Sequence, residues 1–191
     1  MKELNYDELS KDIYQQNVDA GWWDDPNRCI YQTLQLISTE IAEATEGARK
    51  DLMDDHLPHR KMEEVELADV NIRLLDFAGR MNLSVDESFT PLAITTISEY
   101  LSTNAFTSGR CHFIMNQLLV DLAEDLDGKD GYKTSPEKLE EAYTALLLMV
   151  LGYGKSKGYD IESAMFEKLD YNKKRLDHKR ENRRKEGGKG F

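Results

Sequence analysis

The chain of 191 residues lacks several features that mark whole classes of protein. Its two cysteines, Cys29 and Cys111, lie far apart and form neither a disulfide framework nor the short spacing of a zinc site. No apolar run approaches the roughly 18 residues that a membrane-spanning helix requires. Residues 1–7 lack the basic-then-apolar pattern of a secretory signal. These absences predict a reduced, cytoplasmic protein that contacts no membrane.

Strict alternation of apolar and polar residues, which marks half-buried strands, is also missing. Helix-forming residues dominate, and apolar residues recur at helical spacing. Asp25 is expected to cap a helix whose first residue is Pro26. The length suits one well-formed core. The sequence therefore predicts a single all-α domain over 1–191, an antiparallel bundle of helical hairpins, with helices over 6–18, 26–50, 61–81, 91–104, 111–126, 136 to 152 or 154, and 161–180.

Basic residues are in the minority, with 25 Lys and Arg against 36 Asp and Glu, and the net charge is −11. Residues 168–191 nevertheless contain ten Lys and Arg and four Asp and Glu, a local balance of +6, so the remainder carries −17. An acidic body argues against a large contact surface for duplex DNA, and no nucleic-acid partner is expected. The basic end is suited to phosphate groups or to the acidic body of a neighbouring subunit.

Two short acidic motifs, Glu40-x-x-Glu43 and Glu66-x-x-Asp69, lie in two consecutive predicted helices. Residues three apart occupy neighbouring turns of one helix face, so an antiparallel hairpin would bring four carboxylates together. Such a cluster is stable only with cations among its members. Ligation by oxygen alone favours Mg²⁺ first and Mn²⁺ second. The four acids are therefore the predicted metal ligands, and a solvated acidic helix face is the alternative for either pair taken singly.

Cationic and polar residues accompany these acids. Arg73 and Asp76 lie on the same strip of the helix as the second motif, and they are predicted to contact and orient the metal ligands without binding the metal themselves. In the last helix, Lys168, Asn172 and Arg175 are spaced by four and three residues and share a face. A lysine and an arginine on one face suit the oxygens of a polyphosphate. The alternative is a basic helix C-terminus that is stabilised by the helix dipole.

The order of these motifs resembles that of the MazG-like all-α nucleoside triphosphate pyrophosphohydrolases, of bacterial or phage type. The resemblance covers residues 21–80 and 160–191, whereas the helices over about 85–155 stand apart as an addition, and a loose basic tail is expected over about 181–191. The matching elements are Gly21-Trp22-Trp23, Glu40-x-x-Glu43, a gap of 22 residues, Glu66-x-x-Asp69-Val70, Lys168-x-x-x-Asn172-x-x-Arg175, His178 and Gly187-Gly188-Lys189.

The resemblance implies a Mg²⁺-dependent hydrolase of nucleotide metabolism. Such an enzyme cleaves a (d)NTP between the α- and β-phosphates and releases a nucleoside monophosphate and pyrophosphate, which clears unwanted nucleotides from the pool. Glu40 or Glu43 would position or deprotonate the attacking water. Trp22 or Trp23 would stack on the base of the nucleotide. The alternative is that these tryptophans cover the core. The implied substrate contacts are Lys168, Asn172, Arg175, Trp22 and Trp23.

Three matters stay open at this point. A dUTP-specific hydrolase and a phosphoribosyl-ATP pyrophosphohydrolase belong to the same superfamily and are alternative enzymes. A non-catalytic helical interaction module, docking through its basic tail, is the alternative from a different class.

The oligomeric state is the third open matter. The third helix has two apolar faces, one containing Leu67 and Val70 and the other Ala68 and Ile72. Because one hairpin covers only one face, a homodimer or homotetramer is expected, with active sites near the subunit junction.

Overall fold

The computed structural model describes residues 4–127, 135–178 and 180–183. Within these ranges the regular structure is helical, apart from an isolated bridge between Met53 and Lys61. The all-α prediction is thereby confirmed, and no described helix is long and apolar enough to cross a membrane. The elements are α1 (Tyr6–Asp19), α2 (Ile30–Lys50), α3 (Met62–Met81), α4 (Pro91–Thr103), α5 (Ser108–Asp127), α6 (Pro136–Lys157), α7 (Ile161–Lys174), the 3₁₀ turn η2 (Leu176–His178) and α8 (Arg180–Arg183).

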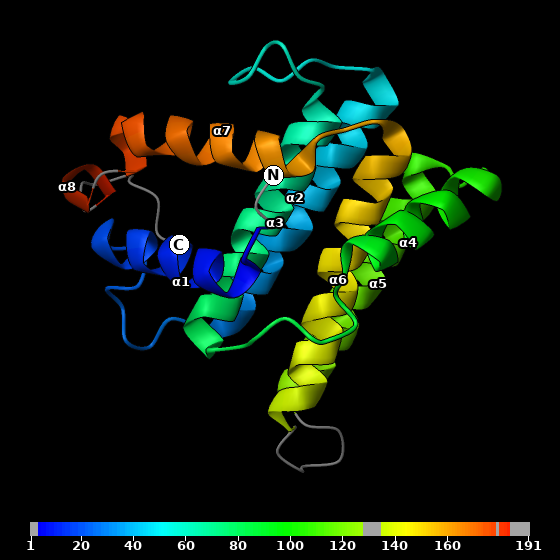
Figure 1. The fold of residues 1–191 in the computed structure, drawn as a ribbon. Coiled ribbons are helices and arrows are strands. Elements are labelled where there is room, and N and C mark those ends of the chain that lie inside the picture. Colours follow the sequence, from blue (N-terminus) through cyan, green and yellow to red (C-terminus); the bar gives the residue numbers. More distant parts are fainter. Residues whose placement is uncertain (1–3, 128–134, 179, 184–191) are drawn as a thin grey trace.

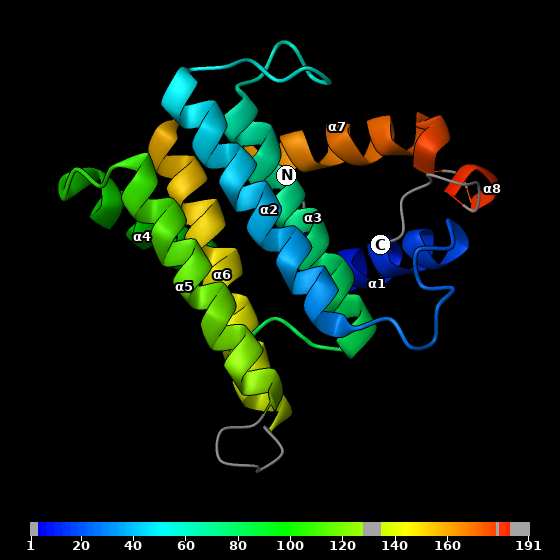
Figure 2. The same ribbon diagram turned by 180° about the vertical axis from the view of Figure 1, so that it is seen from behind.

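An antiparallel hairpin of α2 and α3 forms the centre of the molecule (Figure 1). Helices α1 and α7 lie across one side of α3, so that segments from both ends of the chain meet there. The hairpin of α5 and α6 packs on the other side, where α5 contacts α2 and α6 contacts α3, as the view from behind shows (Figure 2). Helix α4 packs against α6. The α2–α3 hairpin is thus covered on two sides by its own chain.

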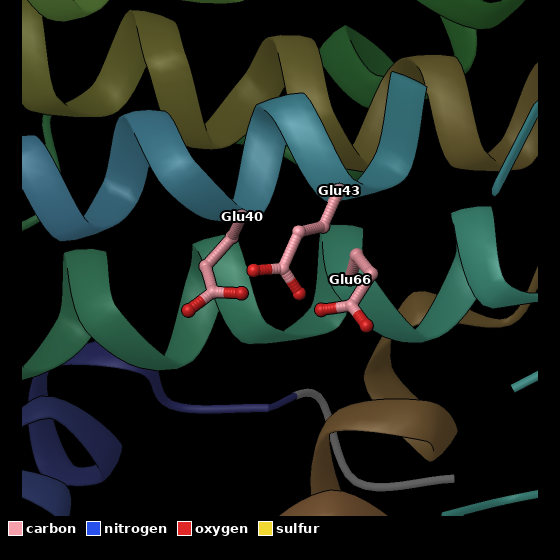
Figure 3. A group of neighbouring side chains, drawn as sticks. All are labelled: Glu40, Glu43 and Glu66. Atoms are coloured by element: carbon pink, nitrogen blue, oxygen red, sulfur yellow. The ribbon is translucent and has the colours of Figure 1, made fainter. Parts of the chain in front are cut away.

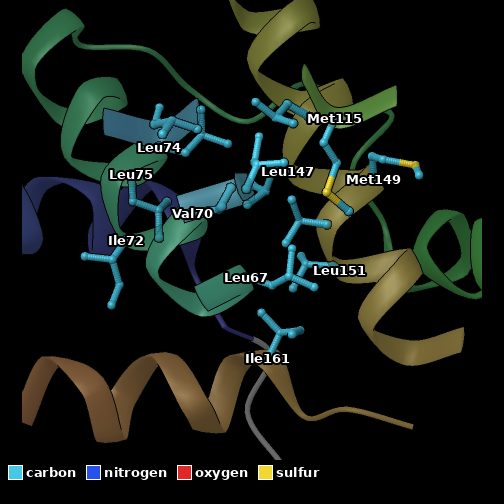
Figure 4. Packing of buried hydrophobic residues seen from close by; sticks show 14 of the residues in the cluster. Leu67, Val70, Ile72, Leu74, Leu75, Met115, Leu147, Met149, Leu151 and Ile161 are labelled. Atoms are coloured by element: carbon cyan, nitrogen blue, oxygen red, sulfur yellow. The ribbon is translucent and has the colours of Figure 1, made fainter. Parts of the chain in front are cut away.

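Helix α3 is the most deeply buried element of this arrangement. Leu67, Val70 and Leu74 have no exposed surface, and they lie in one cluster with Leu147 of α6 and Ile161 of α7 (Figure 4). Ala68 and Ile72 of its second apolar face are buried as well, and α3 also packs against α1 and α7. The expectation of an oligomer depended on α3 needing a partner for that second face. Because α1, α6 and α7 of the same chain pack on α3, the structure removes this reason for expecting an oligomer, and the oligomeric state itself stays a prediction.

A close approach of α2 to α3 fixes how their side chains face one another. Gly47 allows it, since a Cβ atom at this position would lie 2.8 Å from the backbone nitrogen of Glu63. The connection between the helices is held by Asp54, whose Oδ1 accepts hydrogen bonds from the backbone nitrogens of His56 and Leu57 at 2.9 and 2.7 Å. An aspartate that accepts from the backbone two and three residues on stabilises a turn. The hairpin register that follows brings Glu43 of α2 next to Glu66 of α3.

The predicted start of the second helix is wrong. Helix α2 begins at Ile30 instead of Pro26. Asp25 does not cap it, because its Oδ1 accepts a hydrogen bond from the backbone nitrogen of Asn27 at 2.9 Å and its carbonyl accepts one from Arg28 at 3.2 Å. Asp25 therefore closes a turn of its own, and the chain between α1 and α2 stays non-helical.

Two helix ends also differ from prediction. Helix α6 continues past Gly152 and Gly154 to Lys157, because these glycines face Ile97 and Ile161 and make room for them inside the packing. Gly158, with φ of 77°, ends the helix instead. The last helix stops at Lys174 rather than Arg180, since Arg175 is extended. The predicted loop at 128–131 and the basic tail from 184 onward lie outside the described residues.

Candidate metal centre

Three of the four predicted metal ligands converge between α2 and α3. One carboxylate oxygen from each of Glu40, Glu43 and Glu66 lies within 4.8 Å of the others. Glu40 and Glu43 extend from successive turns of α2 toward Glu66 on α3 (Figure 3). The spacing of three residues and the antiparallel hairpin, both predicted from the sequence, together produce this meeting.

Ionising all three carboxylates of the acidic cluster is energetically unfavourable, because two of them are buried and all three lie close together. Glu40 and Glu66 are each only 6% exposed, whereas Glu43 is exposed. Burial, together with the nearby negative charges of Asp69, Glu40 and Glu43, raises the pKa of Glu66 to about 9. Glu66 therefore keeps its proton at neutral pH while no cation is bound. A divalent cation among these oxygens would offset the repulsion between the carboxylates and so favour the loss of that proton from Glu66.

Asp69, the fourth predicted ligand, stands apart from this group. Its Oδ2 is 2.8 Å from Nζ of Lys168, and both side chains are largely buried. Burial and the charge of Glu40 raise the pKa of Asp69 against the opposing effect of Lys168. Although burial favours a neutral amine, Asp69 and Glu66 raise the pKa of Lys168. The two shifts have different main causes, since burial raises the pKa of Asp69 whereas the neighbouring carboxylates raise the pKa of Lys168.

The strip of α3 beyond the ligands carries the two residues predicted to support them. Arg73 lies 2.5 Å from Oε1 of Glu40 and so orients one carboxylate of the cluster. Asp76 accepts a hydrogen bond from Nε1 of Trp23 at 3.1 Å. Burial raises the pKa of Asp76 to about 6, against the opposing hydrogen bonds from Asn17 and Trp23. Arg73 touches a predicted ligand directly, whereas Asp76 contacts Trp23 and Asn17.

The two tryptophans have different surroundings. Trp22 lines the cavity described below and makes an edge-to-face contact with His178, with ring centroids 5.4 Å apart. Trp23 packs edge-on against Tyr14, and the guanidinium of Arg28 lies 4.3 Å above its ring. Trp23 therefore has the structural surroundings of a packed side chain, and Trp22 is the tryptophan that faces the space beside the acids.

A cavity of about 500 Å³ opens beside the acidic cluster. It is bordered by α1, α2, α3 and α7, and the acids Glu40, Glu43 and Asp69 form part of its wall. All three predicted phosphate contacts line it, although Arg175 lies beyond the end of α7. Within the described part of the chain, Oδ1 of Asn172 is buried without a hydrogen-bond partner, which leaves an acceptor for a bound molecule. The predicted residues in its wall are Trp22, Glu40, Glu43, Asp69, Arg73, Asp76, Lys168, Asn172 and Arg175.

Sequence reasoning missed the part of the wall that comes from α1 and from the turn after it. Gln16 and Asn17 line the cavity from α1, where they read as an ordinary polar face. Arg28 also lines it and donates a hydrogen bond from Nη1 to the carbonyl of Trp22 at 2.6 Å. Its position two residues before α2 follows no helical period. Its closeness in sequence to the two tryptophans is the one signal that could have identified it.

A second, larger groove of about 960 Å³ lies between α1, α4, α6 and α7. Its wall is mostly apolar, with Leu4, Ile94 and Phe166, and its acids Glu8, Asp12, Asp160 and Glu162 form no group of close metal ligands among the described residues. The only group of three close potential metal ligands found in the described residues is the one between α2 and α3. The chemistry therefore favours the smaller cavity as the candidate functional site.

The donor set of Glu40, Glu43 and Glu66 is made of oxygen only, and two of the three acids are buried. Hard divalent cations such as Mg²⁺ prefer this chemistry, so the residues fit the predicted metal. Comparison of the chain with protein-family models, with curated proteins and with solved structures finds no match. The family resemblance therefore depends on the motifs themselves and on what their residues do in the fold.

Proposed function

We propose that this protein is a Mg²⁺-dependent nucleoside triphosphate pyrophosphohydrolase of the MazG-like type, which converts a (d)NTP to a (d)NMP and pyrophosphate. One observation carries the proposal. Glu40 and Glu43, which meet Glu66 between two packed helices, line a cavity whose wall also carries the buried or half-buried cations Lys168, Arg73 and Arg175. Acids for a metal and cations for phosphate around one space of about 500 Å³ suit a nucleotide.

Glu40, Glu43 and Glu66 are the residues that would hold the metal, with Mn²⁺ as a second possibility. When bound, the cation would neutralise phosphate charge and favour deprotonation of the attacking water. Arg73 keeps Glu40 directed into the cluster through its contact at 2.5 Å. A carboxylate fixed in this way loses less conformational entropy when a ligand binds.

Lys168, Arg73 and Arg175 supply positive charge along the cavity wall. They are suited to the oxygens of a triphosphate, with arginine offering a planar fork and lysine a compact charge. Asn172 offers its buried Oδ1 to a hydroxyl of the sugar. Trp22 offers an aromatic surface to the base, within reach of Arg28.

The hydrolysis itself needs a base and a stabilised leaving group. The oxygen of water forms a bond to the α-phosphorus, and the bond from that phosphorus to the α–β bridging oxygen breaks. One proton of the water passes to Glu43, the exposed member of the cluster, or to Glu40. The electron pair leaves on pyrophosphate, where Lys168 and Arg175 offset the developing charge.

A pyrophosphate-release assay tests this proposal directly. The wild-type protein would be incubated with a panel of canonical and modified dNTPs and NTPs, including dUTP, and with phosphoribosyl-ATP, each with Mg²⁺ and with EDTA. We expect metal-dependent formation of monophosphate and pyrophosphate in equal amounts, and the panel ranks bases and sugars in the same experiment. Absence of turnover on every compound would overturn the enzyme proposal and favour the helical interaction module.

A further inference from the structure

The position of Asp69 is the feature that the proposed function leaves unexplained. Its motif partner Glu66 belongs to the acidic group, yet neither oxygen of Asp69 lies close enough to join it. Asp69 instead contacts Lys168 at 2.8 Å, with side-chain exposures of 15% and 4%. The ion pair therefore lies inside the fold, between α3 and α7, where solvent screens it little.

Glu40 provides an internal comparison, because it too is paired with a cation. Arg73 contacts Glu40 at 2.5 Å, but Glu40 remains a member of the acidic group. The Arg73 side chain is 36% exposed, so its charge is partly solvated. Lys168 is buried and lies near Glu66 and Asp54 as well as Asp69. The two ion pairs thus differ, since the carboxylate paired with Arg73 belongs to the acidic group and the carboxylate paired with Lys168 does not.

We propose that Lys168 restrains Asp69 as a reserve metal ligand and releases it when a triphosphate draws the ammonium group into the cavity. This inference rests on the proposed function, and it makes the metal site complete only when substrate is present. In the structure Oδ2 of Asp69 contacts Lys168 and Asp69 is not part of the acidic group, so its side chain would have to move to become a ligand. Phosphate oxygens in the cavity that Lys168 lines offer the ammonium a new partner.

The proposal couples the binding of metal to the binding of phosphate, and the coupling acts in both directions. If bound phosphate helps Asp69 to reach the metal, then bound metal must help phosphate to bind by the same factor. The resting protein, by contrast, has a buried positive charge beside the ligand group, which opposes a divalent cation. Removing that charge should therefore strengthen the binding of metal alone, although the residue is expected to contact substrate.

Isothermal titration of Mn²⁺ alone, without nucleotide, tests the restraint. Lys168→Met is expected to bind Mn²⁺ about tenfold more tightly than the wild type, within the usual range for coupled sites. Lys174→Met is the matched control, because Lys174 is on the same helix, is 74% exposed and pairs with Asp170. The control should bind Mn²⁺ like the wild type. Equal or weaker binding by Lys168→Met would overturn the proposal.

A double-mutant cycle with Asp69→Asn identifies the ligand that Lys168 restrains. In the wild type, Asp69→Asn should change the affinity for Mn²⁺ little, since Asp69 is held by Lys168. In the Lys168→Met background, the same change should remove the gain. A loss of affinity on Asp69→Asn that is equal in both backgrounds contradicts the restraint. Circular dichroism and thermal unfolding of each variant establish that it is folded before titration.

The same titrations separate this inference from the proposed function. If the wild type hydrolyses nucleotides but Lys168→Met binds Mn²⁺ no more tightly, the restraint is wrong and the enzyme assignment stands. If Lys168→Met binds Mn²⁺ more tightly but the wild-type protein hydrolyses no nucleotide, the restraint stands and the hydrolase assignment is wrong.

Discussion

Individual carboxylates in this protein have distinct physical settings, even where the sequence presents them as repeats of one pattern. Glu43 and Glu46 are three residues apart on α2, and both fit the spacing of an acidic pair. Glu43 belongs to the group with Glu40 and Glu66, whereas Glu46 contacts Arg49 and Lys50 on the outer surface. The difference between a ligand and a surface charge is thus set by the direction of each side chain.

The change Glu43→Gln tests this difference at the level of activity. It keeps the size of the side chain but removes a proton acceptor, and we expect kcat to fall by about 100-fold or more, as is usual for loss of a general base. Glu46→Gln is the control, because it removes the same charge from the same helix outside the group. The measurement is pyrophosphate release under saturating Mg²⁺. Full activity of Glu43→Gln would remove Glu43 from the mechanism.

Glu63 is a buried acid that serves stability and lies outside the group of metal ligands. Its carboxylate accepts hydrogen bonds from the hydroxyls of Tyr153 and Tyr159 at 2.6 and 2.7 Å, and Nε2 of His112 is 3.3 Å away. Burial alone would raise the pKa of Glu63, but the contacts with His112, Tyr153 and Tyr159 outweigh it and hold the pKa at about 2. The folded state therefore binds the ionised form more strongly than the unfolded chain does.

The sign of the pH dependence follows from this shift. A carboxylate whose pKa falls on folding stabilises the protein fully at pH values above its pKa in the unfolded chain, which is 4.5. That stabilisation is lost as the pH falls toward the pKa of the folded state, about 2. We expect Glu63→Gln to lower the free energy of unfolding by about 2 kcal/mol at pH 7. The gap between variant and wild type, measured by urea denaturation, should narrow between pH 5 and 3. A gap that is independent of pH would contradict the assignment.

At the scale of elements, the site depends on how closely α3 approaches its neighbours. Helix α1 crosses α3 at Gly79, where a Cβ atom would lie 2.4 Å from the carbonyl oxygen of Ser10 and 2.6 Å from Cβ of Tyr14. Because the carbonyl belongs to the backbone of α1, the two helices would have to separate. The crossing matters for function because α1 carries Gln16 and Asn17 into the cavity wall.

Gly79→Ala is therefore expected to destabilise the fold by about 1–3 kcal/mol, the usual cost of overpacking, despite the better helix propensity of alanine. Gly109→Ala is the matched control, since a Cβ atom there would meet nothing within 4 Å. Gly109 lies in α5, and the control should be neutral or stabilising by up to about 1 kcal/mol. Chemical denaturation of both variants makes the comparison. Equal effects at the two positions would refute the close crossing.

At the scale of the whole molecule, the α2–α3 hairpin is the centre on which α1, α5, α6 and α7 pack. It is enclosed by α1 and α7 on one side and by the α5–α6 hairpin on the other (Figures 1 and 2). A cation held between α2 and α3 would link the two central helices. Because such a ligand binds the folded state only, its binding free energy adds to the stability of the entire fold.

Mg²⁺ is accordingly expected to raise the melting temperature of the wild-type protein. At a concentration of about 100 times Kd the stabilisation is about 2.7 kcal/mol, which corresponds to roughly 5–10 °C for a chain of this size. Glu66→Gln should respond much less, because it lacks one of the three ligands. Differential scanning calorimetry with Mg²⁺ and with EDTA provides the measurement. An unchanged melting temperature of the wild type, or an equal rise in the variant, would exclude this metal site.

The sequence by itself determined the all-α class, most of the helices and the acids that meet. These features depend on local periodicity: apolar residues at helical spacing define the helices, and a separation of three residues places Glu40 beside Glu43. The gathering of Lys168, Asn172 and Arg175 at one cavity was also predicted from their spacing. The cavity holds Arg175 even though the helix that suggested it ends one residue earlier.

Only the tertiary structure decided which neighbours each of these residues has. It pairs Asp69 with Lys168 of α7 instead of placing it in the acidic group, adds Arg28 to the cavity wall, and packs α1, α6 and α7 of the same chain on α3. Each of these outcomes depends on contacts between segments distant in sequence. Periodicity describes one helix at a time, and so it cannot specify which helix will pack on which face.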